Sequence, residues 1–199
     1  MHECAHAYAA DRAGDPTAKS LGRKTLNPLK HIDPVGFICL IFLGFGWAKP
    51  VPINPNNFRD KKKDTLKVSL AGVSTNLVMA FLAVFFYVLT MRISVSAGGV
   101  AGTTSVVVQY VLLFFNMLAG INLSFMIFNL LPIPPLDGWQ ALKTGLLGRM
   151  NLNWIWNYER YGQLIMLVLL VTGVIGMILS PLVNGIFNGF MSLWLWIFF

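Results

Sequence analysis

Charged residues are scarce in this chain. Lys, Arg, Asp and Glu make up 12% of its 199 residues, about half of the ~25% that is typical of soluble domains. So few charged side chains could not cover the surface of a water-soluble globule. The composition excludes a disordered chain, a coiled coil and a protein that coats nucleic acid. With 56% hydrophobic residues, it indicates an integral membrane protein.

Cysteines and acidic residues are also few. Cys4 and Cys39 cannot form a disulfide framework, and we interpret them as free thiols in apolar surroundings. Eight acidic residues face fifteen basic ones, which gives a net charge of +7. Most of the Lys and Arg residues fall in two stretches, 12–30 and 59–67. Loops rich in Lys and Arg tend to stay cytoplasmic, so the charge indicates a lipid bilayer as partner and no nucleic acid.

Long apolar runs predict an all-α polytopic membrane protein with about four to five membrane segments. Three runs are near the roughly 20 residues that a spanning helix needs: Leu66–Met91, Ser105–Leu131 and Leu164–Leu182. The tail to Phe199 is expected to form a short final segment. Val35–Ala48 has too few residues to span, so we expect a short re-entrant or β-like segment near residues 35–58.

The strongest chemical signal is His2-Glu3-Cys4-Ala5-His6, an HExxH motif. Residues 2–13 suit a helix, and positions i and i+4 of a helix lie on one face, so both imidazoles can reach one metal ion. Glu3 projects about 100° away from His2, beside the metal, where its carboxylate can take a proton from a bound water. The alternative is that two helix histidines share this spacing by accident. Histidine is costly inside a membrane, which favours the metal site.

A catalytic zinc ion keeps three protein ligands and one open position. Asp137 is the best candidate for the third ligand because it follows a spanning helix and the backbone-disrupting run Pro132–Leu136. Its alternative role is to cap a helix. His31 is a competing ligand, although it is more typical of a loop histidine.

Topology supplies a check on this ligand set. If the two basic stretches are cytoplasmic, helix 66–91 leads out of the cell and helix 105–131 returns. Asp137 then lies on the same side as His2 and His6. We therefore expect residues 14–34, 49–65 and 138–163 to be cytoplasmic and residues 92–104 to lie outside.

Five amide side chains lie within the predicted spans. For four of them we expect hydrogen bonds between helices: Asn76, Gln109, Asn116 and Asn122. Asn129 differs because it stands next to the proline-rich break. It could hold an unwound substrate strand or an oxyanion.

Several segments together resemble the site-2 protease family of intramembrane zinc metalloproteases, most closely its small prokaryotic branch without a PDZ domain. They are HECAH, GDPTAK, GRKTLNPLKHIDPVG, GWAKPVPINPNNF, AGVSTN and NLLPIPPLDG, and the resemblance covers roughly residues 2–140. It implies that His2, His6 and Asp137 bind one zinc ion and that Glu3 is the general base. Asn129 matches the residue that opens the family's NxxPxPxxDG motif. Substrates would be membrane-anchored proteins of a prokaryotic cell membrane, cut near its cytoplasmic face.

The chain departs from the family pattern at three places. Val73 stands where proline is usual, and Trp139 stands where a small residue is common, so the packing behind Asp137 could differ. The family also has a hydrophobic stretch before HExxH, where this chain has one residue. We therefore expect residues 1–199 to form a single membrane-embedded metalloprotease domain that lacks its N-terminal membrane segment.

The leading functional hypothesis is hydrolysis of peptide bonds within the membrane, with Glu3 activating a zinc-bound water. The alternative is a catalytically inactive membrane protein with a structural metal site, or one that binds transmembrane helices without cutting them. Glu3 favours the enzyme, because a structural site has no use for a base. The sequence makes no prediction of oligomeric state.

Overall fold

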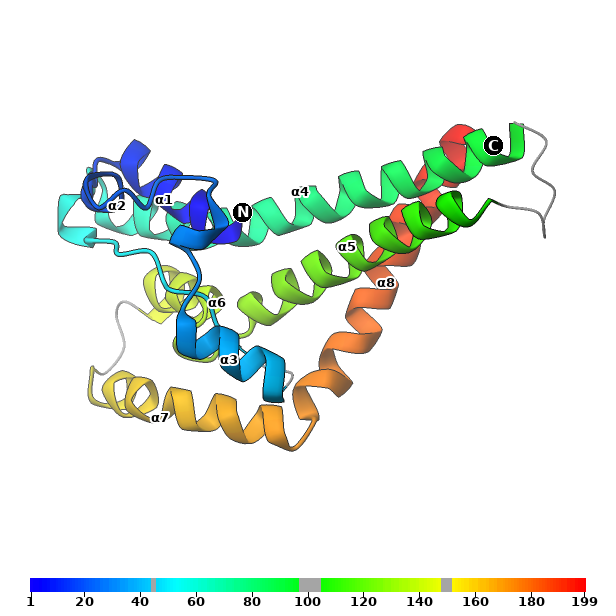
Figure 1. Ribbon diagram of the computed structural model, residues 1–199. Helices are drawn as coiled ribbons and strands as arrows, with labels where there is room; N and C mark the ends of the chain where they lie inside the picture. The colour runs from blue at the N-terminus through cyan, green and yellow to red at the C-terminus, as the bar shows by residue number, and fades with distance from the viewer. Residues whose placement is uncertain (44–45, 97–104, 148–151) are drawn as a thin grey trace.

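Helices account for nearly all the regular structure of the protein. The computed structural model in Figure 1 describes residues 1–43, 46–96, 105–147 and 152–199. Its elements are α1 (His2–Ala13), α2 (Thr17–Ser20), η1 (Pro28–Lys30), α3 (Pro34–Leu43), η2 (Pro55–Asn57), α4 (Lys61–Ser96), α5 (Val106–Leu130), α6 (Asp137–Leu142), the π-helical turn η3 (Lys143–Leu147), α7 (Leu152–Val171) and α8 (Val174–Phe198). Within these described ranges the extended pairing is a single β-bridge between Ile32 and Ala48. The predicted all-α class is confirmed.

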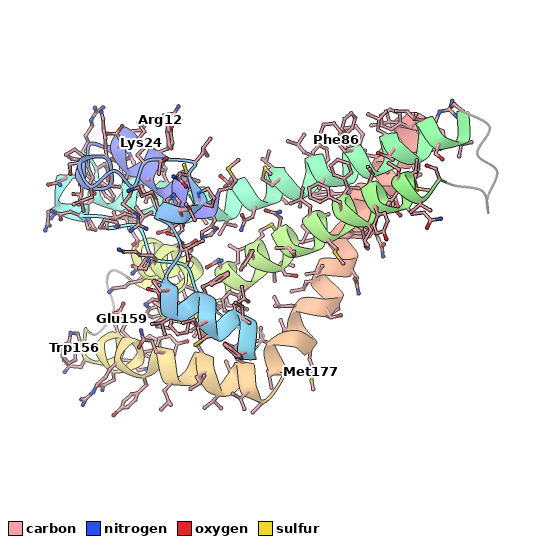
Figure 2. All side chains as sticks on the ribbon, in the orientation of Figure 1. Arg12, Lys24, Phe86, Trp156, Glu159 and Met177 are labelled. Atoms are coloured by element: carbon pink, nitrogen blue, oxygen red, sulfur yellow. The ribbon has the colours of Figure 1, made fainter. Side chains whose placement is uncertain are left out.

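Three helices, α4, α5 and α8, are long and apolar enough to cross a membrane. They pack against one another, with α4 and α5 side by side and α8 crossing both (Figure 1). Small residues such as Ala83 and Ala119 are fully buried between them and let the helices approach closely. Many outward side chains are apolar and exposed, as Phe86 shows in Figure 2, which suits a surface that faces lipid.

One predicted span is wrong. The run Leu164–Leu182 is not a single helix, because α7 ends at Val171 and α8 begins at Val174. Gly173 between them has φ 75, a left-handed conformation that ends helices and that glycine adopts without steric cost. The tail is consequently no short segment but belongs to α8, which continues to Phe198. The predicted total of four to five membrane segments stays a prediction.

The other spans agree more closely with the sequence. Helix α5 matches the run Ser105–Leu131, whereas α4 extends beyond Leu66–Met91 at both ends. At its start, Asp60 accepts hydrogen bonds from the backbone N–H groups of the first turn, so the basic segment becomes part of the helix. Of the predicted outer turn at 92–104, residues 92–96 continue α4 and residues 97–104 lie outside the described part.

The predicted short segment at Val35–Ala48 begins as the ten-residue helix α3, which is apolar and largely exposed. Such a length cannot cross a bilayer. The chain then returns as a Pro- and Asn-rich loop, residues 46–58, which packs near α1: Val51 shares a buried cluster with Ala7, and Phe58 shares one with Ala10. This loop and the first half of α4 enclose α1 and position the HExxH motif.

Candidate metal centre

Three side chains from two distant helices converge at one point. His2 and His6 lie one turn apart on α1, and Asp137 is the first residue of α6. The Oδ2 atom of Asp137 lies 3.1 Å from Nε2 of His2 and 3.2 Å from Nε2 of His6. The two Nε2 atoms are 3.1 Å apart. The three atoms therefore form a nearly equilateral triangle.

The sides of the triangle come within about 0.3 Å of those that a tetrahedral zinc ion requires. Bonds of about 2.0–2.1 Å at tetrahedral angles separate neighbouring ligand atoms by about 3.3–3.4 Å. Two imidazole nitrogens and one carboxylate oxygen are also ligands that zinc prefers, and three of them leave a fourth position open. His6 is buried, while His2 and Asp137 are partly exposed, so the triangle is accessible to an ion.

The imidazole of His6 is held in one tautomer. Its Nδ1 lies 2.8 Å from the carbonyl oxygen of Val68 on α4. A carbonyl can only accept, so Nδ1 carries the hydrogen and the neutral ring presents a lone pair at Nε2. That lone pair faces the buried Oδ2 of Asp137, which has no hydrogen-bond partner among the described residues. A cation between these acceptors satisfies both, so the residues fit a metal ion.

The imidazole of His2 is held by a residue on the same face of α4, about two turns beyond Val68. The amide nitrogen of Asn76 lies 3.2 Å from Nδ1 of His2. When Nε2 binds a metal, Nδ1 carries the proton, and the same amide turned by 180° offers its oxygen to it. Partners of this kind orient metal-binding histidines.

Gly72 lets α4 approach these two rings. A Cβ atom at this position would lie 2.5 Å from Cε1 of His2 and 2.5 Å from Nε2 of His6, closer than any real Cβ contact. The small residue is therefore required where α4 passes the imidazoles.

Asp137 is placed by the turn that follows α5. Residues 131–136 reverse the chain, and α6 begins with Asp137 and Gly138. A side chain at Gly138 would collide with the carbonyl oxygen of Leu130, which explains the Asp-Gly pair. Burial would raise the pKa of the Asp137 carboxyl, but the imidazoles of His2 and His6, when they carry protons at Nε2, outweigh it and hold this pKa below its ordinary value. The group is therefore a carboxylate.

Trp139 anchors α6 to α7. It is 1% exposed, and its ring packs against that of Tyr158. Its indole N–H donates to Oε1 of Glu159 at 2.9 Å, and the Lys143 ammonium donates to the same atom at 2.6 Å. Tyr158 also donates to the carbonyl oxygen of Pro132 at 2.9 Å. The start of α7 therefore fixes both sides of the turn that carries Asp137.

Glu3 lies beside the triangle and contacts the loop 46–58. The backbone N–H of Val51 donates to Oε2 of Glu3 at 3.0 Å. Among the described residues this bond leaves Oε1 of Glu3 unengaged, so one carboxylate oxygen is fixed and the other can exchange a proton.

Asp15 holds the same loop in place. Its buried carboxylate accepts hydrogen bonds from Asn54 N at 2.7 Å, from Asn57 Nδ2 at 2.8 Å, and from the backbone and hydroxyl of Thr17. Burial would raise the pKa of Asp15, but these donors outweigh it and lower the pKa below its ordinary value. Asp15 thus connects the turn after α1 with the loop that contacts Glu3.

Comparison with known proteins decides which family these features belong to. The family model described as Peptidase family M50 matches residues 1–173. The chain belongs to peptidase family M50. The resemblance to site-2 proteases is thereby confirmed.

Relatives of this M50 chain carry zinc metalloprotease names. A Bacillus subtilis (strain 168) protein, provisionally named zinc metalloprotease YwhC, is 39% identical over 93% of this chain and 81% of its own length. A Mycolicibacterium smegmatis protein, provisionally named zinc metalloprotease Rip2, is 31% identical over 94% of this chain and 69% of its own length. No solved structure matches the chain at a significant level. The M50 chain is therefore an integral membrane protein of a zinc metalloprotease family.

Two of the predicted candidates do not join the triangle. His31 is held elsewhere, with Nε2 2.8 Å from the carbonyl oxygen of Thr25, and it does not belong to the ligand cluster of the described residues. Asn129 donates to the carbonyl oxygen of Phe125 within α5 at 2.9 Å. Sequence reasoning missed the roles of Val51 and Asp15. The dipeptide Asp15-Pro16 is typical of a turn, but nothing in the sequence indicates which loop the carboxylate binds.

Proposed function

We propose that this M50 member is an intramembrane zinc endopeptidase that hydrolyses peptide bonds in or near the transmembrane segments of membrane-anchored proteins. His2, His6 and Asp137 would hold one zinc ion, and Glu3 would act as general base. The observation that carries the proposal is the triangle of three ligand atoms with a carboxylate beside it.

The chemistry assigns a task to each residue. A zinc ion held by His2, His6 and Asp137 would supply Lewis acidity, which makes a water molecule easier to deprotonate. Glu3 accepts a proton from the attacking water at Oε1 and passes it to the amine that leaves. The backbone N–H of Val51 keeps Oε2 of Glu3 fixed during this exchange, so that the carboxylate stays close to the substrate carbonyl.

Charge supports a site near the cytoplasmic face of a prokaryotic cell membrane. Arg12 and Lys24 lie at the end of the molecule that carries α1 and α2, as Figure 2 shows. Further basic residues, Lys61, Lys62 and Lys63, begin α4 at the same end. Basic loops favour the cytoplasmic side, which supports a position of the triangle near that surface.

The test is Glu3→Gln in purified protein reconstituted with zinc and a membrane-anchored reporter substrate. Glutamine keeps the size of the side chain but cannot accept the proton, so cleavage should fall by at least about 100-fold. Asp11→Asn is the matched control, because it makes the same change on the same helix at a carboxylate that pairs with Lys24. It should retain cleavage within about twofold. Unchanged cleavage in Glu3→Gln contradicts the proposal, and a wild-type protein that binds zinc without cutting favours the structural-metal alternative.

A further inference from the structure

A groove of about 820 Å³ lies between α5 and α8, away from the metal triangle. Both helices are candidate membrane spans, so the groove lies within the membrane. Its walls are apolar except for four polar side chains: Asn116 and Ser124 on α5, and Asn184 and Asn188 on α8. Asn184 and Asn188 are four residues apart and therefore share one face of α8.

The three amide side chains of the groove lack a hydrogen-bond partner among the described residues. Asn116, Asn184 and Asn188 are exposed and make no hydrogen bond within the described part of the chain. Other amides of α5 are satisfied by their own helix, since Asn122 donates to Leu118 O at 2.8 Å and Asn129 donates to Phe125 O at 2.9 Å. This corrects the expectation that Asn116 bonds to a neighbouring helix of the same chain. An amide in hydrocarbon is costly unless something pairs with it.

The groove points toward the metal centre. Its α5 wall includes Met117, Ile121 and Phe125, and the next position of that row, four residues on, is Asn129 beside the turn that carries Asp137. From Asn116 to Asn129 the helix rises about 20 Å. A second helix lying in the groove would therefore have its middle at the amides and its end near the metal centre. A lipid tail has no group that could bond to the amides.

We propose that this groove binds the transmembrane segment of a substrate that carries an amide or hydroxyl side chain near its middle. The amides on α8 and Asn116 on α5 hydrogen-bond to that side chain, and the row ending at Asn129 leads the segment to the cutting site. This inference rests on the proposed function, because it takes the bound segment to be that of a substrate. It adds that the protein selects transmembrane segments with a polar side chain near their middle.

The experiment measures binding without cleavage. The Glu3→Gln protein in phospholipid vesicles is titrated with two quencher-labelled peptides of about 20 residues, one all-Leu and one with a single central Asn. The Asn peptide should bind at least about threefold more tightly, the gain typical of one hydrogen bond between membrane helices. The double variant Asn184→Leu, Asn188→Leu should lose this preference. The matched control Asn122→Leu removes an amide that is already paired, and should keep it.

The outcomes separate the two proposals. Equal binding of both peptides overturns the groove assignment, whatever the cleavage assay shows. A preference for the Asn peptide that the double variant abolishes supports it, even if the wild-type chain cuts nothing and the proposed function fails. If the wild-type chain is a dimer and the double variant a monomer, a second copy fills the groove and the substrate assignment is wrong. Metal content and thermal unfolding of the double variant should equal those of the parent.

Discussion

The backbone N–H of Val51 donates to the carboxylate of Glu3 at 3.0 Å, so the loop 46–58 and the HExxH helix are joined at the residue proposed as the base. Val51 is itself held in the small cluster with Ala7 and Ala18. The position of the proposed base therefore depends on residues about fifty positions away in the sequence. Asp15 anchors the same loop and so affects the position of Glu3 indirectly.

Asp15→Asn should destabilise the protein and loosen this loop. The carboxylate accepts four hydrogen bonds, and an amide cannot accept all of them, because its nitrogen can only donate. We expect a loss of about 2 kcal/mol in the free energy of unfolding, measured by denaturation in detergent. Asp60→Asn is the control, since Asp60 is an exposed helix cap where Asn serves equally well. Equal stability of the two variants would contradict the anchor role.

The pH dependence of that difference follows from the lowered pKa of Asp15. Because its folded pKa lies below the unfolded value of about 3.9, the carboxylate stabilises the fold fully above that value. The stabilisation is lost as the pH falls through the folded pKa. Unfolding curves of wild type and Asp15→Asn should therefore differ by a constant amount from pH 7 to about pH 5 and converge in stronger acid. A difference that grows on acidification would rule out this explanation.

Gly72→Ala should weaken zinc binding. The added methyl group meets both imidazoles at 2.5 Å, so α1 or the rings must move and the ligand atoms lose their positions. We expect the zinc affinity, measured by competition with a chelator, to fall by at least about tenfold, the lower end for disturbing the groups that support a ligand. Gly189→Ala, on α8 with nothing within 4 Å of the new Cβ, should leave it unchanged. Equal affinities would mean that α4 tolerates the displacement.

Glu159→Leu should destabilise the turn that carries Asp137. It leaves the buried indole N–H of Trp139 without an acceptor and frees Lys143, at a cost of about 2 kcal/mol in unfolding free energy. Arg160→Leu changes the neighbouring exposed residue and should cost less than about 0.5 kcal/mol. Thermal unfolding of the two variants in the same detergent checks this. If the two variants unfold alike, α7 does not fix α6.

The sequence predicts local features of this molecule better than contacts between segments. The spacing of His2 and His6 predicts that both lie on one face, because a helix repeats locally. Asp137 is predicted as their partner because the membrane topology puts it on the same side of the bilayer. The run Leu164–Leu182 is predicted as one span because glycines inside an apolar run barely lower its hydropathy, whereas Gly173 ends one helix and precedes the next. No local pattern indicates that Trp139 is buried, because its partner, Glu159, lies on another helix. The bond from Val51 to Glu3 involves a backbone donor, which no side-chain pattern reveals.

The proposed orientation can be tested by cysteine labelling on a background without Cys4 and Cys39. Lys62 and Ser96 lie at opposite ends of α4 and are exposed. In intact cells, a reagent that cannot cross the membrane should label Ser96→Cys and not Lys62→Cys. Labelling of both from outside would contradict a cytoplasmic metal centre.

The most direct test of the account is the zinc content of three purified proteins, measured by elemental analysis after removal of loosely bound metal. Wild type and Glu3→Gln should each hold one zinc ion per chain, because Glu3 is beside the ligand triangle and not part of it. Asp137→Ala removes one of three ligand atoms and should hold far less. Full zinc occupancy in Asp137→Ala would contradict the triangle of His2, His6 and Asp137 as the metal centre.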